Sequence, residues 1–279
     1  MKHWAIIALL ATLGCGNKSD VAPPLATCGS DGCHPGSGVS VVPGTGGSSS
    51  VTDVDGGVTL TVNGVAFASS SSDSNAWSLS NVKNVTESLK VQAASVSGSV
   101  LTSTGSSPIV LAGVSTDNFA WVSASPTSTS SAYLSSIISI ANWTTTSVSV
   151  PLMLADDFAF VSSLLTTTPL TLDATKAQLA IKIVDVNGNG VRNARIKDPG
   201  AATVAYANSG VWTDVSLGPF TDESGRVVVV NLPAPTTPGT FATITPYGNN
   251  TSGTEVTSTG VLPIEAAFVS FGTILLDLR

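Results

Sequence analysis

Residues 179–196, LAIKIVDVNGNGVRNARI, and residues 220–233, FTDESGRVVVVNLP, decide the fold of this 279-residue chain. The first segment places large apolar side chains at the alternate positions Leu179, Ile181 and Ile183, with Lys182 between the last two, and then reaches the turn residues Asn187–Gly190. The second segment places the polar turn Thr221–Gly225 before four successive valines. Alternation with period two, interrupted by Asn-Gly and Ser-Gly turns, is typical of antiparallel β-structure. These residues therefore predict β-strands joined by tight turns.

The same residues resemble the carboxypeptidase regulatory-like, transthyretin-type β-sandwich module. The usual pattern of that module opens as V-V-D-x-x-G-x-P-V-x-G-A and ends as T-D-x-x-G-x-F-x-F-x-N-L-P. In this chain Arg192–Ala194 replaces the x-G-A sequence, and Val228 and Val230 stand where aromatic residues are common. The resemblance covers residues 174–279 and implies a β-sandwich scaffold without implying an activity.

Residues 1–15 have the form of a lipoprotein signal peptide. A short polar start precedes the apolar stretch Trp4–Leu13, which is shorter than the roughly 20 residues that span a bilayer. The sequence Thr12–Cys15 resembles a bacterial lipobox. We expect Cys15 to carry a lipid such as palmitate, and Gly16 in place of aspartate favours an outer-membrane lipoprotein on the surface or the periplasmic face. Without that lipid, the protein would be secreted.

The rest of the chain separates into a linker and two modules. Residues 16–53 are rich in Gly, Ser and Pro and lack apolar periodicity, which predicts a disordered linker. From residue 54 onward, short alternating segments separated by Ser, Gly and Asn predict a sandwich. We expect a degenerate β-sandwich module over residues 54–130 and the better-marked module over residues 174–279.

Residues 131–173 are expected to connect the two modules through one or two short helices. Tyr133, Ile137 and Ile140 fall at helical spacing, and a second helical pattern covers residues 156–165. The predicted fold is therefore mainly all-β, with two Ig- or transthyretin-like antiparallel β-sandwich modules and one or two short helices in the connection.

The charge content is low and carries information about partners. The chain has 11 Lys and Arg residues against 18 Asp and Glu residues, a net charge of −7, and charged residues are only 10% of the whole. No block of positive charge is present, whereas phosphate recognition needs clustered Lys and Arg side chains. Nucleic acid is therefore not expected as a partner.

Cys28, Cys33 and His34 form the one local motif that suggests a prosthetic group. Cysteine pairs followed by histidine attach c-type haem, and two cysteines with a histidine can also bind metal. Against both hypotheses, no other histidine follows the signal peptide, and Met153 is the only other candidate for an axial ligand. Exported chains usually pair their cysteines. We therefore favour a disulfide between Cys28 and Cys33 and expect no cofactor and no metal.

The remaining polar motifs suggest turns before they suggest chemistry. Asp185–Gly190 matches the first half of a calcium loop, but Ile196 stands where the bidentate glutamate should be.

A Ser-His-Asp triad cannot be assembled because the only mature histidine, His34, lies in the linker. We therefore expect no enzymatic activity.

Tyr206 and Trp212 are the candidate ligand-binding residues. They lie in a polar segment, and exposed Trp and Tyr side chains form the platforms on which some β-sandwiches bind sugars. The alternative is that both side chains belong to the core.

These observations predict a non-catalytic, structural, adhesive or ligand-presenting lipoprotein of the cell envelope. Its partners would be the membrane, through the lipid anchor, and a surface glycan or another envelope protein. One alternative is a fimbria-type subunit that assembles by strand donation, with Phe268–Arg279 as the donated segment. A carbohydrate-binding accessory module and a c-type haem protein are further alternatives.

Overall fold

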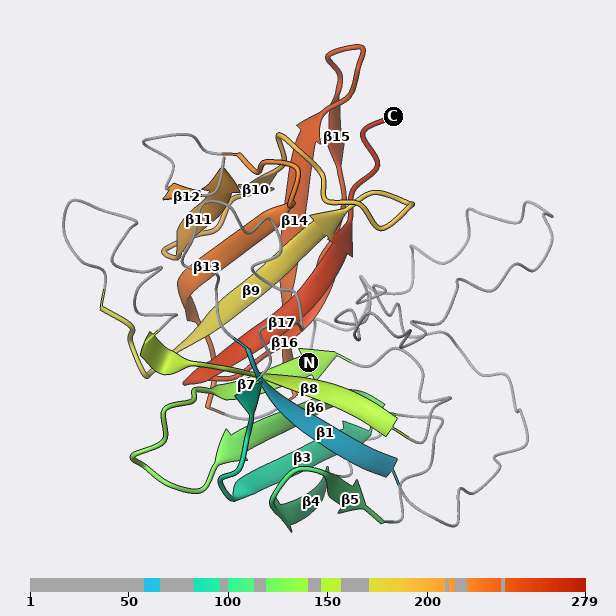
Figure 1. Cartoon of the computed structure of the whole chain (residues 1–279). Helices are drawn as coiled ribbons and strands as arrows, with labels where there is room; N and C mark the ends of the chain where they lie inside the picture. The colour runs from blue at the N-terminus through green and yellow to red at the C-terminus, as the bar shows by residue number, and fades with distance from the viewer. Residues whose placement is uncertain are drawn as a thin grey trace, which may run out of the picture.

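The structure is a computed structural model and describes residues 58–65, 83–95, 100–112, 119–139, 147–156, 171–208, 211–213, 220–236 and 239–279. These residues form seventeen β-strands arranged in three sheets, which confirms the predicted all-β fold (Figure 1). Residues 1–57, which include the predicted signal peptide, the predicted linker and Cys15, Cys28, Cys33 and His34, lie outside the described part. Within the described residues, no helix is long and apolar enough to cross a membrane.

The largest sheet has nine strands and runs through both halves of the chain. Its order is β12-β11-β13-β9-β17-β7-β6-β3-β4. In that order the strands are β12 (Val211–Thr213), β11 (Thr203–Asn208), β13 (Arg226–Pro233), β9 (Lys176–Val184), β17 (Phe268–Leu275), β7 (Ser135–Ser139), β6 (Phe119–Pro126), β3 (Leu89–Ser95) and β4 (Val100–Gly105). We call it the shared sheet.

Two four-stranded sheets cover parts of the shared sheet. The first, the β1 sheet, consists of β1 (Val58–Val65), β2 (Lys83–Asn84), β5 (Ile109–Leu111) and β8 (Ser147–Met153). The second, the β14 sheet, consists of β10 (Arg195–Lys197), β14 (Thr240–Asn249), β15 (Glu255–Thr257) and β16 (Gly260–Ile264). Strands β1–β8 make the N-terminal sandwich, and strands β9–β17 make the C-terminal sandwich.

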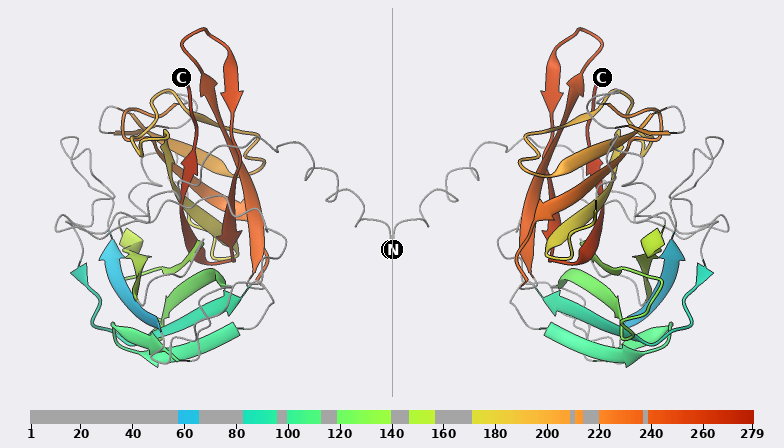
Figure 2. Two further views of the ribbon diagram at one scale, coloured as in Figure 1. Left: turned by 90° about the vertical axis from the view of Figure 1, so that its right-hand side faces the viewer. Right: turned by 90° about the vertical axis from the view of Figure 1, so that its left-hand side faces the viewer.

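The two covering sheets lie on opposite faces of the shared sheet. Val91 and Val122 on one face pack with the β1 sheet, whereas Leu179 and Ile181 on the other face pack with the β14 sheet. The register places these two pairs on opposite faces, because Val122 lies opposite Ile138, whereas Leu179 lies beside Ser270, which pairs with Ile137. Figure 2 shows the two covers on opposite sides of the molecule. The result is three layers rather than two separate domains.

Strands β17 and β7 join the two sandwiches. Residues Phe268–Phe271 of β17 pair in parallel with Ser135–Ile138 of β7, and the other edge of β17 pairs in parallel with β9. Parallel neighbouring strands are joined by long connections rather than by a tight turn, so β17 can pair with β7, which lies more than a hundred residues earlier in the chain. The hydrogen-bond ladder is therefore continuous across the junction.

The four valines Val227–Val230 are buried on both faces of β13. Val227 and Val229 belong to the core beneath the β14 sheet, whereas Val228 and Val230 belong to a cluster that Val65 of β1 and Met153 of β8 also enter. A strand covered on both faces is expected to be continuously apolar. The run of valines, which departs from the usual alternation, thus reflects contact with the ends of the N-terminal sandwich.

For the connecting segment, one of the two expected helices is wrong and the other falls outside the described residues. The first expected helix is wrong over residues 135–139, which form β7, because Ile137 and Ile138 face opposite sides of a sheet and are paired on both edges. The second expected helix lies outside the described residues beyond Asp156. Because β7 and β8 complete the N-terminal sandwich, that sandwich extends past residue 130 to Met153.

The segment Phe268–Arg279 is also not a loose terminal strand. Its residues Phe268–Leu275 are β17, which lies between β9 and β7 in the middle of the shared sheet. Donating this segment to another molecule would remove the strand that holds the two sandwiches together.

Candidate functional site

The first turn of the sequence motif is held by the side chain of Asp185. Its Oδ1 accepts hydrogen bonds from the backbone N–H groups of Asn187, at 2.8 Å, and of Asn189, at 2.9 Å. Burial raises the pKa of Asp185, but the hydrogen bonds from Asn189 and Asn187 outweigh it, and the pKa lies below its usual value. These bonds form an Asx-type turn, which is the ordinary role of aspartate at the start of a tight connection.

The acidic residues of the described part are dispersed. Within it, no three His, Cys, Asp or Glu side chains gather as metal ligands. Asp222 accepts hydrogen bonds from the Ser224 N–H at 2.9 Å and from its hydroxyl at 2.6 Å, and exposed Glu223 pairs with Arg192 at 3.0 Å. Both residues thus serve their own turn and a surface ion pair.

Thr221, the first residue of the second motif turn, is buried and ties that turn to the first. Its hydroxyl donates to the Val191 carbonyl at 2.6 Å and accepts from the Ala194 N–H at 3.0 Å. The backbone of Thr221 also accepts from the Asn193 N–H at 2.8 Å. The threonine of the motif therefore positions the chain that enters β10.

Tyr206 and Trp212, the candidate ligand-binding residues, are core side chains. Tyr206 is 2% exposed and Trp212 is 9% exposed, so they do not form an exposed aromatic platform. The Tyr206 hydroxyl lies across the sandwich and accepts a hydrogen bond of 3.0 Å from the Ile196 N–H. Burial raises the pKa of Tyr206, although the Ile196 bond opposes that change. The register also places the two side chains on opposite faces, since Trp212 pairs with Ala207.

Asn231, in the N-L-P end of the motif, fixes the start of β9. It has a φ of 60° at the bulge that shifts the register of β13. Its N–H donates to the Gln178 Oε1 at 2.8 Å, and its Oδ1 accepts from the Asp173 N–H at 2.9 Å. Asparagine tolerates this left-handed conformation better than most residues. The conformation and the two bonds together explain why asparagine suits position 231.

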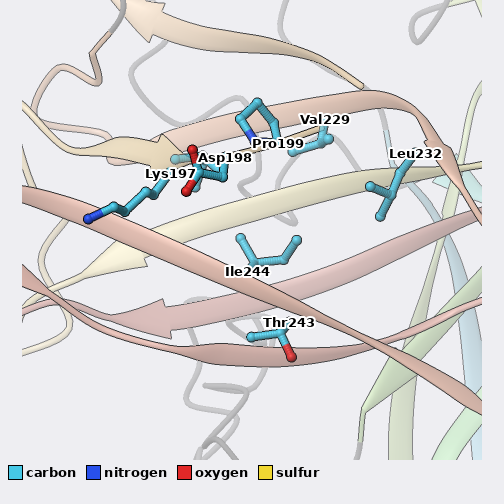
Figure 3. Close-up of a pocket in the computed structure, with 8 residues that line it drawn as sticks. Lys197, Asp198, Pro199, Val229, Leu232, Thr243 and Ile244 are labelled. Carbon is cyan, nitrogen blue, oxygen red and sulfur yellow. The ribbon is translucent and has the colours of Figure 1, made fainter. Parts of the chain in front are cut away.

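A small recess opens at one edge of the β14 sheet. It has a volume of about 50 Å³ and is lined by Ile196, Lys197, Asp198, Pro199, Val229, Leu232, Thr243 and Ile244 (Figure 3). Pockets for drug-sized ligands are about 300–1,000 Å³. The recess can therefore take one aliphatic side chain but not a sugar or a cofactor.

The recess arises because β10 ends early. Lys197 is the last residue of β10, and Asp198, with a φ of 47°, and Pro199 then lead the chain away from β14. Sequence reasoning missed this feature, although the Asp198-Pro199-Gly200 sequence is a recognisable strand stop.

Glu265 is the most perturbed acidic group at the junction of the sandwiches. It lies between β16 and β17 and is half-buried, and its Oε2 is buried and has no hydrogen-bond partner among the described residues. Desolvation raises the pKa of Glu265 to about 7, and the attraction of Lys90 on β3 of the N-terminal sandwich opposes that change only in part.

The perturbed pKa of Glu265 predicts a pH dependence of stability. Because the folded pKa is about 7 and the usual value is 4.5, the folded state binds the proton more tightly than the unfolded state. The stabilisation of the folded state by protonated Glu265 is therefore full below about pH 4.5 and is lost as the pH rises through about 7. In urea melts, Glu265→Gln is expected to flatten this part of the pH profile by on the order of 1 kcal/mol, after allowance for solvent screening. An unchanged profile in the variant would contradict this assignment.

Taken together, the described residues define an all-β scaffold in which two sandwiches share one sheet. No protein-family model matches the chain, and no curated protein matches it significantly.

Among solved structures, the shaft pilin SpaA from Lactobacillus rhamnosus GG (D295N mutant) aligns with 80% of this chain and 98% of its own length, at 12% identity and a TM-score of 0.22. A streptococcal ancillary pilin aligns with 79% of this chain and 69% of its own length, at 10% identity and a TM-score of 0.21. At such low TM-scores these likenesses support no transfer of function.

Proposed function

We propose that this protein is a non-catalytic lipoprotein of the cell envelope with a structural, adhesive or ligand-presenting role. Acyl chains on Cys15 would hold it at the outer membrane, and residues 16–53 would act as a flexible tether. The two sandwiches would form the body that is displayed at the end of the tether.

The shared sheet is the observation that carries this proposal. Its nine strands are hydrogen-bonded from β12 to β4 without a break between the sandwiches. Relative motion of two domains is expected where only a small interface joins them, but a shared hydrogen-bond ladder opposes such motion. A stiff body on a flexible tether suits the presentation of surface loops to a partner.

The recess and the aromatic residues support a binding mode without a deep pocket. The described recess has room for about one side chain, and Tyr206 and Trp212 are buried. A carbohydrate platform would therefore have to use residues other than these two. A partner protein that contacts loops and strand edges fits the described surface better.

Lipidation is tested by metabolic labelling with radioactive palmitate. The wild-type protein is expected to incorporate the label, and Cys15→Ala is expected to abolish incorporation because the lipid is attached at that residue. The matched controls are Cys28→Ala and Cys33→Ala, which should label as the wild type does. Label that persists in Cys15→Ala would contradict the anchor.

Protease treatment of intact cells then tests display. Cleavage of the wild-type protein at the cell surface is expected for an outward-facing lipoprotein, because a tether of small and polar residues is open to proteases. Full protection, with cleavage only after the outer membrane is permeabilised, would overturn surface presentation and place the body in the periplasm.

A further inference from the structure

We propose that the edge of β14 at Phe241–Thr243 binds residues Val39–Val42 of a second copy of this chain as an added β-strand. The proposal concerns the tether and the body alone, so it holds whether or not Cys15 carries a lipid. It rests on a strand edge with which no described strand pairs, a mainly apolar recess beside that edge, and the composition of the tether.

The first observation is an unpaired strand edge. The Ser258 N–H donates to the Pro246 carbonyl at 2.9 Å, so Pro246 points its carbonyl toward the side of β14 on which β15 and β16 lie. Because successive residues of a strand point their backbone groups to alternate sides, Phe241 and Thr243 point theirs the other way, toward the β10 side. On that side β10 pairs only with residues 245–247, and no other described strand takes its place.

This edge also lacks the features that keep strand edges from pairing. Natural edges are commonly protected by charged side chains, by proline or by bulges. Residues 240–245 contain no charge and no proline, and Phe241 is 40% exposed. The edge is therefore suited to β-strand addition.

The second observation is the recess, which lies where an added strand would place its inward side chain. A strand that continues the line of β10 would put one side chain opposite Ile244. The recess at that place has a floor of Val229, Leu232 and Ile244, a rim that includes Lys197, Asp198 and Pro199, and a volume of about 50 Å³ (Figure 3). One branched aliphatic side chain is therefore the expected occupant. On the outward face, the next side chain would lie beside exposed Phe241.

The third observation is the composition of the tether. Val39-Ser40-Val41-Val42 is the only place between residues 16 and 57 where three valines occur within four residues. Val39 and Val41 would share the inward face of an added strand, and Val42 would lie on the outward face. No charge occurs between Asp31 and Asp53, so the segment brings no charged group to a recess whose own Lys197 already pairs with Glu255 at 3.3 Å. Pro43 would end the pairing.

A second copy is favoured over the chain's own tether by distance. Residues 43–57 span at most about 50 Å. From Val58, an intramolecular strand would have to pass around the edge of the shared sheet, because β1 and β14 cover opposite faces of that sheet. Such a path would cross two layer spacings of about 10 Å and the width of several strands of about 4.8 Å each. These distances take up most of the available length. The tether of a neighbouring molecule has no such restriction.

Complementary variants of the purified full chain test the proposal. The tether variant V39S/V41S/V42S removes the apolar segment and changes no residue of the described strands. The edge variant Thr243→Pro removes an N–H that points away from β16, so it breaks no described ladder bond. The matched control V51S/V54S changes the two valines that lie between the proposed strand and β1, at residues 51 and 54. Sedimentation equilibrium over a range of concentrations measures the mass of each form.

The wild-type chain and V51S/V54S are expected to rise above monomer mass with concentration, and the tether and edge variants are each expected to remain monomeric. A mixture of the tether and edge variants should form dimers and no larger species, because one supplies an intact edge and the other an intact segment. A monomeric wild type, or association that persists in the tether variant, would overturn the proposal. So would a monomeric mixture, provided that circular dichroism shows both variants folded as the wild type is; if Thr243→Pro is not folded, Thr243→Lys replaces it.

Discussion

Replacing Gly225 with alanine is expected to lower the free energy of unfolding by about 3–5 kcal/mol, which is the largest single-methyl effect that we predict for this chain. Urea denaturation monitored by tryptophan fluorescence measures it. The midpoint should move to much lower urea at an unchanged slope, because the variant alters stability rather than the surface exposed on unfolding.

The reason is that two backbones meet at Gly225 with no room for a side chain. A Cβ at Gly225 would lie 2.1 Å from the Ile183 carbonyl oxygen and 2.8 Å from the Val191 nitrogen. Neither atom can move alone, since the Ile183 N–H donates to the Gly225 carbonyl at 2.7 Å and the Val191 N–H donates to the Ile183 carbonyl at 2.9 Å. The φ of 66° at Gly225 adds a further penalty of about 1–2 kcal/mol for any residue with a Cβ.

Gly188→Ala is the matched control for this prediction. Gly188 lies in the neighbouring turn and has a φ of 83°, but nothing lies within 4 Å of an added Cβ. Its replacement is expected to cost only the conformational penalty, about 1–2 kcal/mol. Equal losses of stability in Gly225→Ala and Gly188→Ala would show that the backbone contact at Gly225 contributes nothing.

The C-terminal sandwich could be predicted because its signals are local. Asn187–Gly190 follows β9 and Thr221–Gly225 precedes β13, as expected, although β9 and β10 lie in different sheets rather than in one hairpin. What the spacing could not show is that the two turns touch: the Cβ built on Gly225 also lies 2.9 Å from the Gly190 Cα. A contact between residues 35 positions apart depends on the tertiary arrangement, which no local pattern encodes.

The shared sheet could not be predicted because its key pairing is non-local and parallel. Ser135–Ser139 has serines on both faces and an isoleucine on each, so its own pattern is neither clearly helical nor clearly alternating. Its strand conformation is imposed by β6 on one edge and β17 on the other. Tertiary pairing overrides weak local preference in such segments.

The sequence suggested Tyr206 and Trp212 as exposed ligand-binding residues, but both side chains are buried, and the reason is related. Trp212 was placed in a polar loop by its sequence neighbours, but β12 pairs with β11 and directs this side chain into a cluster with Val228 and Phe271. The face that would be solvated in an isolated sandwich is buried here, because the ends of β1 and β8 reach it. Whether a strand face is solvated depends on the neighbouring layer, and that layer is encoded elsewhere in the chain.

Replacing Trp121 with alanine is expected to destabilise both sandwiches together by about 3–5 kcal/mol, the range found when a buried large aromatic side chain is removed. Trp121 lies on β6 of the N-terminal sandwich and is 2% exposed. It packs with Ile137 of β7, and Phe268 at the start of β17 packs against the same cluster. The Trp121 Nε1 also lies 3.5 Å from a Cβ built on Gly239, next to the start of β14. The side chain therefore lies at the boundary between the two sandwiches.

Hydrogen exchange followed by mass spectrometry distinguishes shared from separate unfolding. If the continuous sheet couples the sandwiches, Trp121→Ala should reduce protection in β9 and β13 as well as in β3 and β6, because the opening of β6 and β7 exposes one edge of β17. Val110→Ala is the matched control, since Val110 is in the same sandwich but 52% exposed, and protection should not change. Loss of protection confined to β3 and β6, with wild-type protection in β9 and β13, would mean that the ladder between β7 and β17 opens before either sandwich unfolds. The shared sheet would then be a contact between two independently stable domains, and the stiffness on which the proposed display function rests would be lost.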